Sequence, residues 1–542
     1  MSGHKSSSIS LLLLLLLSVA VFAASPIQER ADRFLKLANA GYQALFRVNS
    51  EAQWLAVTDV TPEHAAAVEA TGKAYAAFNG NPAILNEARD LLIHQKELDE
   101  LTVRQLKQLL LNAAEGPMTN PDLVAKRVPA ETKQASMLNS FAFKLNDQKI
   151  TANEIDNKLE KSTDLNERKA VWEASKESGP ALKPNLVTLR DLRNGVAKEM
   201  KYPDYFSLEV AAYGMTADEM LKMLEAWMAT LRPLYSQLHT WAKYKLAEKY
   251  NQPVPKKIPA HWINNRWGQK WPGLVEAANI DTYFEGRKPE WIIKTAEQFY
   301  TGLGFSPLPE SFWKKSDLYP LPPDSKRKKN THASCWHIDL ENDICSLQSI
   351  EPDARWFFTA HHELGHGYYF KAYTRPEVPY LLRIGAAPGF HEGVGELIAL
   401  APSQVPYLQS RGVLPADFKP NKTAFLLDDA LARSVPFIYF SCGVMPHWEA
   451  DIYAHNLPPD QWNARWWKYV SDFQGIEPPS PRGEEFCDAA TKTHINDNLL
   501  IITIMRSPPY LSFNCTITSR ARFFINRRNH VTMPTTRTSA RG

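Results

Sequence analysis

The chain has 542 residues, of which 44% are hydrophobic and 15 are tryptophan, and this apolar content is sufficient for a large folded core. Its formal net charge is only +3, so the charge balance gives no basis for nucleic acid as a partner. No internal repeat is evident, and we therefore expect one folded unit rather than two.

The first 23 residues have the parts of a secretory signal peptide. His4 and Lys5 form a short basic region, and an apolar run follows at residues 11–22. A pattern of small residues ending at Ala23 gives a cleavage site after that residue. The apolar run is short for a membrane span, and no later segment reaches that length. We expect a secreted or periplasmic protein with no transmembrane segment after signal cleavage.

The segments that follow are mostly helical in character. Residues 121–146 and 164–177 both favour helices. Thr216 and Glu219 form a capping box, and the apolar residues between 220 and 231 recur at helical spacing, which predicts a helix with a buried stripe. Proline-rich connections are expected at residues 253–259 and 307–323.

A short strand is predicted at residues 332–340. It follows a basic run at residues 325–329, which we interpret as a solvated loop. An extended segment of this kind can pair with an extended peptide through backbone hydrogen bonds, and so can align that peptide.

The most specific pattern is HHELGH at residues 361–366, followed by a glutamate at position 392. On a helix, His362 and His366 are four residues apart and share one face, so both imidazoles can reach one metal ion. Glu363 is placed to contact a metal-activated water rather than to ligate the metal. Glu392 is a candidate third ligand from a second helix. Two histidines and one glutamate leave a fourth position open, which is typical of a hydrolytic zinc site for peptide-bond cleavage.

The residues around this pattern strengthen the zinc interpretation. Aromatic and apolar residues at 356–360 and 368–370 predict that the helix is largely buried. Buried histidine and glutamate side chains need partners, and a metal supplies them. Glu396 follows Glu392 by four residues on the same helical face, where it can hydrogen-bond a ligand histidine. An ordinary amphipathic helix with two histidines is the alternative interpretation.

Several further motifs occur together with the zinc pattern. They are WGQKW at 267–271, HASCW at 332–336, PGFHEGVGE at 388–396, FQG at 473–475 followed by Pro478 and Pro479, and KTH at 492–494. With these motifs, residues 24–497 resemble the angiotensin-converting enzyme family of zinc dipeptidyl carboxypeptidases, as a single-domain, bacterial-like member. The resemblance implies a mostly α fold, a large two-lobed helical metallopeptidase with a deep central cleft and a few short strands.

The resemblance also implies a role for each motif residue. His362, His366 and Glu392 resemble the zinc ligands, and Glu363 resembles the general base and acid. The implied oxyanion stabiliser is His494, and the implied substrate-binding residues are His332, the backbone of Ala333, Gln269 and Lys492. Gln269 and Lys492 would bind the C-terminal carboxylate of the substrate, for which a lysine ammonium provides a charge-assisted hydrogen bond. Holding that carboxylate at a fixed distance from zinc would make dipeptides the product.

The sequence departs from the family pattern near its C-terminal end. Two tyrosines that the family uses for the oxyanion and the carboxylate fall on Ile504 and Ile501. Loss of one oxyanion donor typically costs about 3 kcal/mol. Residues 498–542 contain no Asp, Glu or Lys, and arginine and threonine are abundant there. We interpret this tail as an aberrant end, from a frameshift or a mispredicted gene, rather than as a divergent basic tail.

The cofactor expected is one zinc ion, and no chloride requirement is predicted because the arginines that typically hold chloride in the family are not recognisable. Five cysteines do not make a disulfide framework. Cys345, Cys442 and Cys487 could pair, and the sequence leaves the combination open.

These features are compatible with three functions. The first is an exported zinc peptidase that releases C-terminal dipeptides from peptides with a free C-terminal carboxylate, impaired by the altered end. The second is a pseudoenzyme that binds zinc and peptides without turnover. The third, an aminopeptidase or endopeptidase, is disfavoured because Gln269 and Lys492 indicate recognition of a substrate C-terminus.

Overall fold

The computed structural model describes residues 25–496 except for positions 115, 140, 276–279, 323, 331–332, 387–389, 396–400, 420, 422–423, 425–426, 429 and 432–434. In this part of the chain helices dominate, and the strands are short and form only two-stranded sheets. The predicted mostly helical class is therefore confirmed. The predicted signal peptide and the predicted atypical tail lie outside the described residues.

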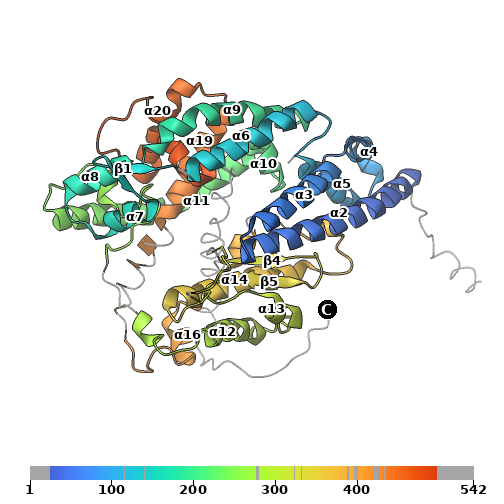
Figure 1. Ribbon diagram of the computed structural model, residues 1–542. Helices are drawn as coiled ribbons and strands as arrows, with labels where there is room; N and C mark the ends of the chain where they lie inside the picture. Colours follow the sequence, from blue (N-terminus) through green and yellow to red (C-terminus); the bar gives the residue numbers. More distant parts are fainter. Residues whose placement is uncertain are drawn as a thin grey trace, which may run out of the picture.

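The N-terminal part contains four helices that each begin at a polar capping residue (Figure 1). A side-chain oxygen of each cap accepts a hydrogen bond from a backbone N–H of the first turn. Proline opens the first three helices, where its missing N–H costs no helical hydrogen bond. The caps are Ser25, Thr61, Asn81 and Asp99. The helices are α2 (Pro26–Thr58), α3 (Pro62–Asn79), α4 (Pro82–Ile93) and α5 (Glu100–Ala113).

The helix predicted for residues 121–146 ends earlier than expected, at Asn139. Its last residues form a hairpin, whose turn residues Asn146 and Asp147 have φ angles of 51° and 61°. Asparagine and aspartate tolerate this left-handed backbone, which a two-residue hairpin turn requires, so the polar pair ends the helical pattern. The elements are α6 (Pro121–Asn139), β1 (Phe143–Leu145) and β2 (Gln148–Ile150).

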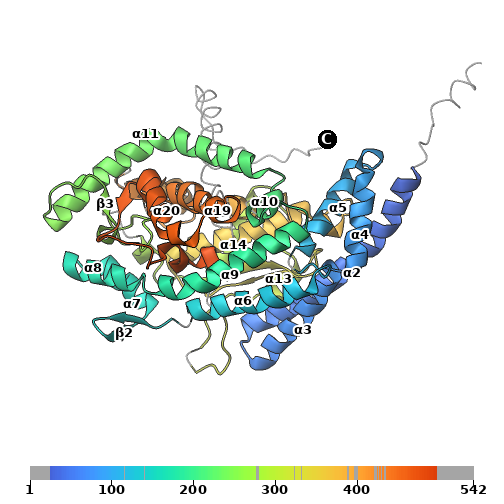
Figure 2. The same cartoon turned by 90° about the horizontal axis from the view of Figure 1, so that it is seen from above.

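The capping box predicted at Thr216 and Glu219 is present, with both of its reciprocal hydrogen bonds. It starts α11 (Ala217–Tyr250), which runs across one face of the molecule in Figure 2. The predicted apolar stripe is largely buried, at Met220, Leu224, Met228 and Leu231. The helix predicted for residues 164–177 is shorter than expected and ends at Ala174, because a turn at 175–177 leads directly into the next helix.

The largest core joins segments that are far apart in the sequence. Helices from the middle of the chain pack there against helices and turns from the C-terminal part (Figure 2). The middle elements are α7 (Ala152–Lys161), α8 (Leu165–Ala174), α9 (Ser178–Glu199), α10 (Tyr205–Ala211) and β3 (Ile258–Pro259). The C-terminal elements are α18 (Val435–Ile438), α19 (Met445–Tyr453), α20 (Trp462–Tyr469), β6 (Ile476–Glu477) and α21 (Thr493–Asn496).

A second core surrounds α14 (Ala354–Tyr373), the helix that contains the HHELGH pattern. The strand predicted at residues 332–340 is present but shorter, as β4, which pairs antiparallel with β5 beside α14. The remaining elements here are α12 (Pro289–Gly302), α13 (Glu310–Lys315), β4 (Ser334–His337), β5 (Ile344–Leu347) and α16 (Val405–Ser410).

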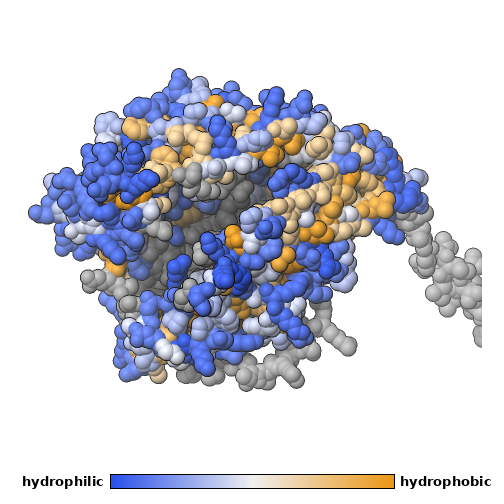
Figure 3. Space-filling view, viewed as in Figure 1, coloured by the Kyte–Doolittle hydropathy of each residue, from blue (hydrophilic) through white to orange (hydrophobic). Residues whose placement is uncertain are grey.

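In Figure 1 the helices α6 and α9 lie above α14, and Figure 3, in the same view, shows a hollow in this face of the molecule between the two parts. Among the helices of the described residues, none combines the length and the apolar character needed to cross a membrane. The sequence left a pairing of Cys345, Cys442 and Cys487 open, and the structure gives all three as buried free thiols.

Candidate active site

The position of α14 is fixed by its N-cap and by its apolar face. The Asp353 side chain accepts a hydrogen bond from the backbone N–H of Trp356 at 2.6 Å, which sets the first turn. Phe357, Ala360 and Leu364 are fully buried in the core around this helix. The burial of this face determines the direction in which the intervening histidines point.

The first histidine of the HHELGH pattern, His361, is a packing residue. It is fully buried, and burial lowers its pKa to about 4, so the ring is neutral. Its Nδ1 donates to the Phe357 carbonyl oxygen at 2.7 Å, and its Nε2 lies 3.1 Å from the Tyr407 hydroxyl. The Tyr300 hydroxyl donates to the His361 carbonyl oxygen at 2.6 Å. These contacts occupy both ring nitrogens, which excludes His361 as a ligand in this arrangement.

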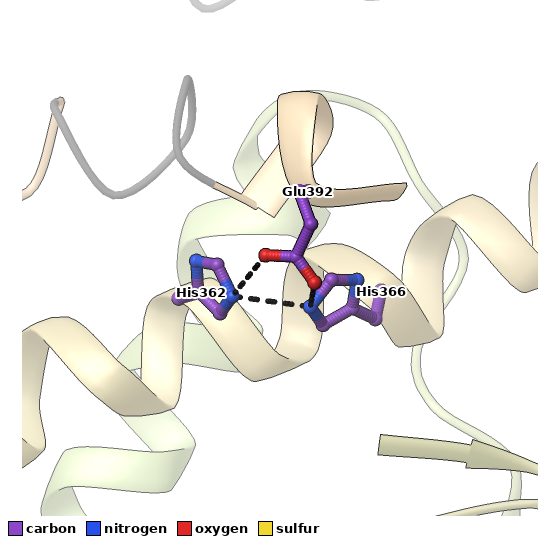
Figure 4. Close-up of side chains that lie close together, drawn as sticks. All are labelled: His362, His366 and Glu392. Carbon is purple, nitrogen blue, oxygen red and sulfur yellow. Dashed lines mark hydrogen bonds and ion pairs between the residues drawn. The ribbon is translucent and has the colours of Figure 1, made fainter. Parts of the chain in front are cut away.

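His362, His366 and Glu392 come together at one point (Figure 4). The two histidine Nε2 atoms are 3.1 Å apart. The Glu392 carboxylate lies 3.5 Å from His362 and 3.8 Å from His366, and all three ligand atoms lie within 4.8 Å of one another. Glu392 belongs to the helical residues 390–395, which cross above α14. The three residues thus form a candidate metal-binding triad.

Gly395 permits this close approach of two helical segments. A methyl group at Gly395 would lie 2.8–3.2 Å from three ring atoms of His362. A methyl group at Gly365 on α14 would lie 3.0 Å from the Gly395 Cα atom. Both distances are too short for an ordinary carbon contact, so the two glycines together let the Glu392 segment reach the histidines.

The electrostatics of the triad fit a zinc ion. Burial lowers the pKa of His366 to about 3, so its imidazole is neutral and its lone pair is available. Two facing imidazole nitrogens with a carboxylate beside them form an N₂O donor set, which is common for catalytic zinc. A cation between the three groups would satisfy both lone pairs and the carboxylate charge.

Glu363 is buried beside the triad, with 6% of its surface exposed. Burial raises the pKa of Glu363 to about 7, while His362 lowers it and Glu392 raises it further. A divalent cation in the triad would lower this pKa again. With a cation bound, Glu363 would therefore be a buried carboxylate that can accept a proton.

Gln269 and Lys492, more than 200 residues apart in the sequence, are in direct contact. The Lys492 ammonium donates to Gln269 Oε1 at 3.0 Å and lies 4.4 Å from the centre of the Trp267 ring. Lys492 is buried, with 6% of its surface exposed. His494 lies two residues further on, in α21, and is partly buried.

Of the remaining predicted site residues, Ala333 lies within the described part of the chain. Ala333 precedes β4 and packs against the core around α14. His332 and Glu396 lie outside the described residues.

Sequence reasoning missed Lys176, Trp172 and Thr491. Lys176 lies in the turn between α8 and α9, and its ammonium is 3.4 Å from the Thr491 hydroxyl and 5.1 Å from the centre of the Trp172 ring. The only signal in the sequence was the spacing of Trp172 and Lys176, four residues apart at the end of a predicted helix. That spacing alone does not indicate a site.

Comparison with known proteins identifies the family. The family model described as "Angiotensin-converting enzyme" matches residues 25–508. The angiotensin-converting enzyme of Haematobia irritans exigua is 30% identical over 362 residues, which are 63% of this chain and 58% of that protein. The Rattus norvegicus enzyme is 30% identical over 61% of this chain and 26% of its own length. The Mesocricetus auratus enzyme is 26% identical over 87% of this chain and 36% of its own length. The chain spans less than two thirds of each of these relatives, and it belongs to the angiotensin-converting enzyme family.

Proposed function

We propose that this member of the angiotensin-converting enzyme family is an exported zinc peptidase that releases C-terminal dipeptides from oligopeptides. The observation that carries the proposal is the triad of His362, His366 and Glu392 with the buried Glu363 beside it. This constellation supports hydrolysis rather than a structural metal site, because three protein ligands would leave a fourth coordination position for water. Export rests on the apolar run at residues 11–22.

The protein groups around the triad have separate tasks in this proposal. A zinc ion held by the triad would supply Lewis acidity and an activated water. Glu363 would accept the proton of the attacking water and deliver it to the leaving amine, as its raised pKa allows. His494 would stabilise the negative charge that develops on the carbonyl oxygen.

The Lys492 and Gln269 pair would define the product. The buried Lys492 ammonium already donates to the Gln269 amide oxygen. A substrate carboxylate would receive a charge-assisted hydrogen bond from Lys492 and a further one from the Gln269 amide group. A peptide anchored by its C-terminal carboxylate would always present the same peptide bond to the triad. If that bond is the second from the C-terminus, the product is a dipeptide.

The test is hydrolysis of an N-terminally blocked tripeptide by purified full-length protein, with zinc content measured on the same sample. We expect dipeptide release that a chelator abolishes and added zinc restores. Stoichiometric zinc without release of a dipeptide would contradict the proposal and favour a protein that binds zinc and peptides without turnover. Release of single amino acids from the N-terminus would instead indicate an aminopeptidase.

A further inference from the structure

Lys176 is a buried cation that the proposed function does not use. Only 2% of its surface is exposed. Its ammonium lies 5.1 Å from the centre of the Trp172 ring and 5.2 Å from the centre of the Trp267 ring, and it is 3.4 Å from the Thr491 hydroxyl. Among the described residues, no carboxylate lies within ion-pair distance of it. Burying an ammonium group in this way is costly unless a negative charge reaches it.

The Trp267 ring connects Lys176 to the predicted carboxylate pocket, which is formed by Gln269 and Lys492. Trp267 has the Lys492 ammonium 4.4 Å from its ring centre and the Lys176 ammonium at 5.2 Å. The Trp267 Nε1–H donates to the Thr491 hydroxyl at 3.1 Å, and Thr491 immediately precedes Lys492. Two buried ammonium groups, the buried Thr491 and the partly buried Trp267 thus form a single cluster.

A close backbone contact holds the segment of Lys176 beside the segment of Thr491 and Lys492. Gly179 lies at the start of α9, three residues after Lys176. A methyl group at Gly179 would lie 2.4 Å from the Cys487 carbonyl oxygen, so only glycine lets α9 approach the segment that leads to Thr491 and Lys492.

The charges around Lys176 favour an additional anion. Three cations act on it, and they are Arg266, Arg482 and Lys492. The carboxylate that acts on it, Asp488, is bound by Arg482 through both oxygens, at 2.5 and 2.7 Å. Asp488 also accepts from Trp467 Nε1 at 2.7 Å, and Arg266 pairs with Asp156 at 2.8 Å. The field at Lys176 is therefore positive in excess, which an incoming carboxylate would balance.

We propose that Lys176 is a specificity-determining residue, whose charge combines with that of Lys492 to select peptides that end in a free carboxylate. The proposal rests on the proposed function, because it deepens the role of the same pocket. Lys176 acts through its charge and through the shared Trp267 and Thr491, and contact with the carboxylate is assigned to Lys492 and Gln269.

If Lys176 has this role, the preference for carboxylate-terminated peptides should depend on pH. Burial lowers the pKa of Lys176 to about 7, with Asp488 raising it and Arg266, Arg482 and Lys492 lowering it. A bound carboxylate adds negative charge and raises this pKa, so binding near pH 7 takes up a proton. Lys176 is charged at pH 6 and mostly neutral at pH 8, and the preference for carboxylate-terminated peptides should fall between these values.

The kinetic experiment compares two matched substrates, a blocked peptide with a C-terminal carboxylate and the same peptide amidated. The ratio of their kcat/KM values cancels the titration of groups such as Glu363, which act on both substrates. For the zinc-loaded wild type we expect the ratio to fall from pH 6 to pH 8. Lys176→Met should lower the ratio about tenfold at pH 6 and remove its pH dependence. Lys176→Arg should keep a high ratio at both pH values, because arginine stays charged.

The control variant is Lys222→Met, which removes a positive charge from an exposed position on α11. Its ratio should match that of the wild type at both pH values. An unchanged ratio in Lys176→Met, with a melting temperature showing a folded protein, would overturn the role of Lys176 and leave the proposed function intact.

A binding experiment separates failure of this inference from failure of the proposed function. Calorimetric titration of a free dipeptide and of its amide, in two buffers of different ionisation enthalpy, reports affinity and proton uptake without turnover. Tighter binding of the free dipeptide with proton uptake at pH 7, both lost in Lys176→Met, would support Lys176 even if no peptide is cleaved. Equal binding of the two dipeptides to the wild type would overturn both the carboxylate pocket and the role of Lys176.

Discussion

The metal-binding triad and the cluster around Trp267 respond to burial in opposite ways. Burial lowers the pKa of His366 to about 3, which keeps the imidazole neutral and ready to bind a cation. Burial also lowers the pKa of Lys176 to about 7, which weakens the charged form that attracts a carboxylate. Desolvation thus prepares the triad for a cation, whereas it opposes the charge on Lys176 that carboxylate recognition requires. The triad needs a cation to satisfy its two lone pairs and its carboxylate, and the cluster around Trp267 needs an anion to offset its ammonium groups.

The largest effect that tests this comparison is expected at the triad. Glu363→Gln removes the proton acceptor but keeps the size and the burial of the side chain. We expect zinc content to stay at one ion per chain and the rate of dipeptide release to fall at least about 10²–10⁴-fold. Zinc analysis and single-substrate kinetics on the same sample measure both quantities. Substantial turnover in this variant would remove Glu363 from the mechanism.

A stability measurement tests the cost of charge in the cluster around Trp267. The pKa of Lys176 in the folded state is about 7, against an ordinary value of 10.5, so the folded state binds fewer protons than the unfolded state between these pH values. The free energy of unfolding should therefore rise with pH from about 7 to 10.5, and the full penalty should be present below pH 7. Lys176→Met should stabilise the protein at pH 6 by a few kcal/mol and reduce the slope above pH 7. Denaturant unfolding of ligand-free protein at several pH values measures this, with Lys222→Met as the control. A destabilised Lys176→Met at pH 6 would show that the buried charge has a partner already.

A smaller effect is expected when the carboxylate contact itself is removed. Lys492→Ala deletes the ammonium that donates to Gln269. We expect KM for a peptide with a free carboxylate to rise about 10- to 100-fold, as for the loss of a hydrogen bond to a charged group. KM for the amidated peptide should change little. Lys222→Ala, at an exposed position, serves as the matched control. An equal change of KM for both peptides would exclude Lys492 from carboxylate recognition.

The two regions also differ in how far the sequence could predict them. His362 and His366 are one helical turn apart, so their spacing alone predicted that they share a face. Lys176, Trp267 and Lys492 come from three distant segments, and no spacing relates them. The hairpin at residues 143–150 was missed because the helical pattern of the preceding residues concealed the turn at Asn146 and Asp147. Local periodicity could be predicted from the residues themselves, whereas contacts between distant segments, such as that of Lys492 with Gln269, were expected only from the family resemblance. The contacts of Lys176 were not predicted at all.

The smallest effect concerns the contact that brings Glu392 to the histidines. In Gly395→Ala the new methyl group would lie 2.8–3.2 Å from the His362 ring, so either the ring rotates or the segment at residues 390–395 moves away from α14. Overpacking of this kind costs about 1–3 kcal/mol, and part of that cost falls on the ligand geometry. We expect weaker zinc binding by roughly tenfold, measured by competition with a chromogenic chelator, and a slightly lower melting temperature. Gly302→Ala is the matched control, because a methyl group at that exposed helical glycine meets nothing within 4 Å. Zinc affinity equal to that of the control would mean that the helices can separate without moving Glu392, and that the close glycine contact serves packing alone.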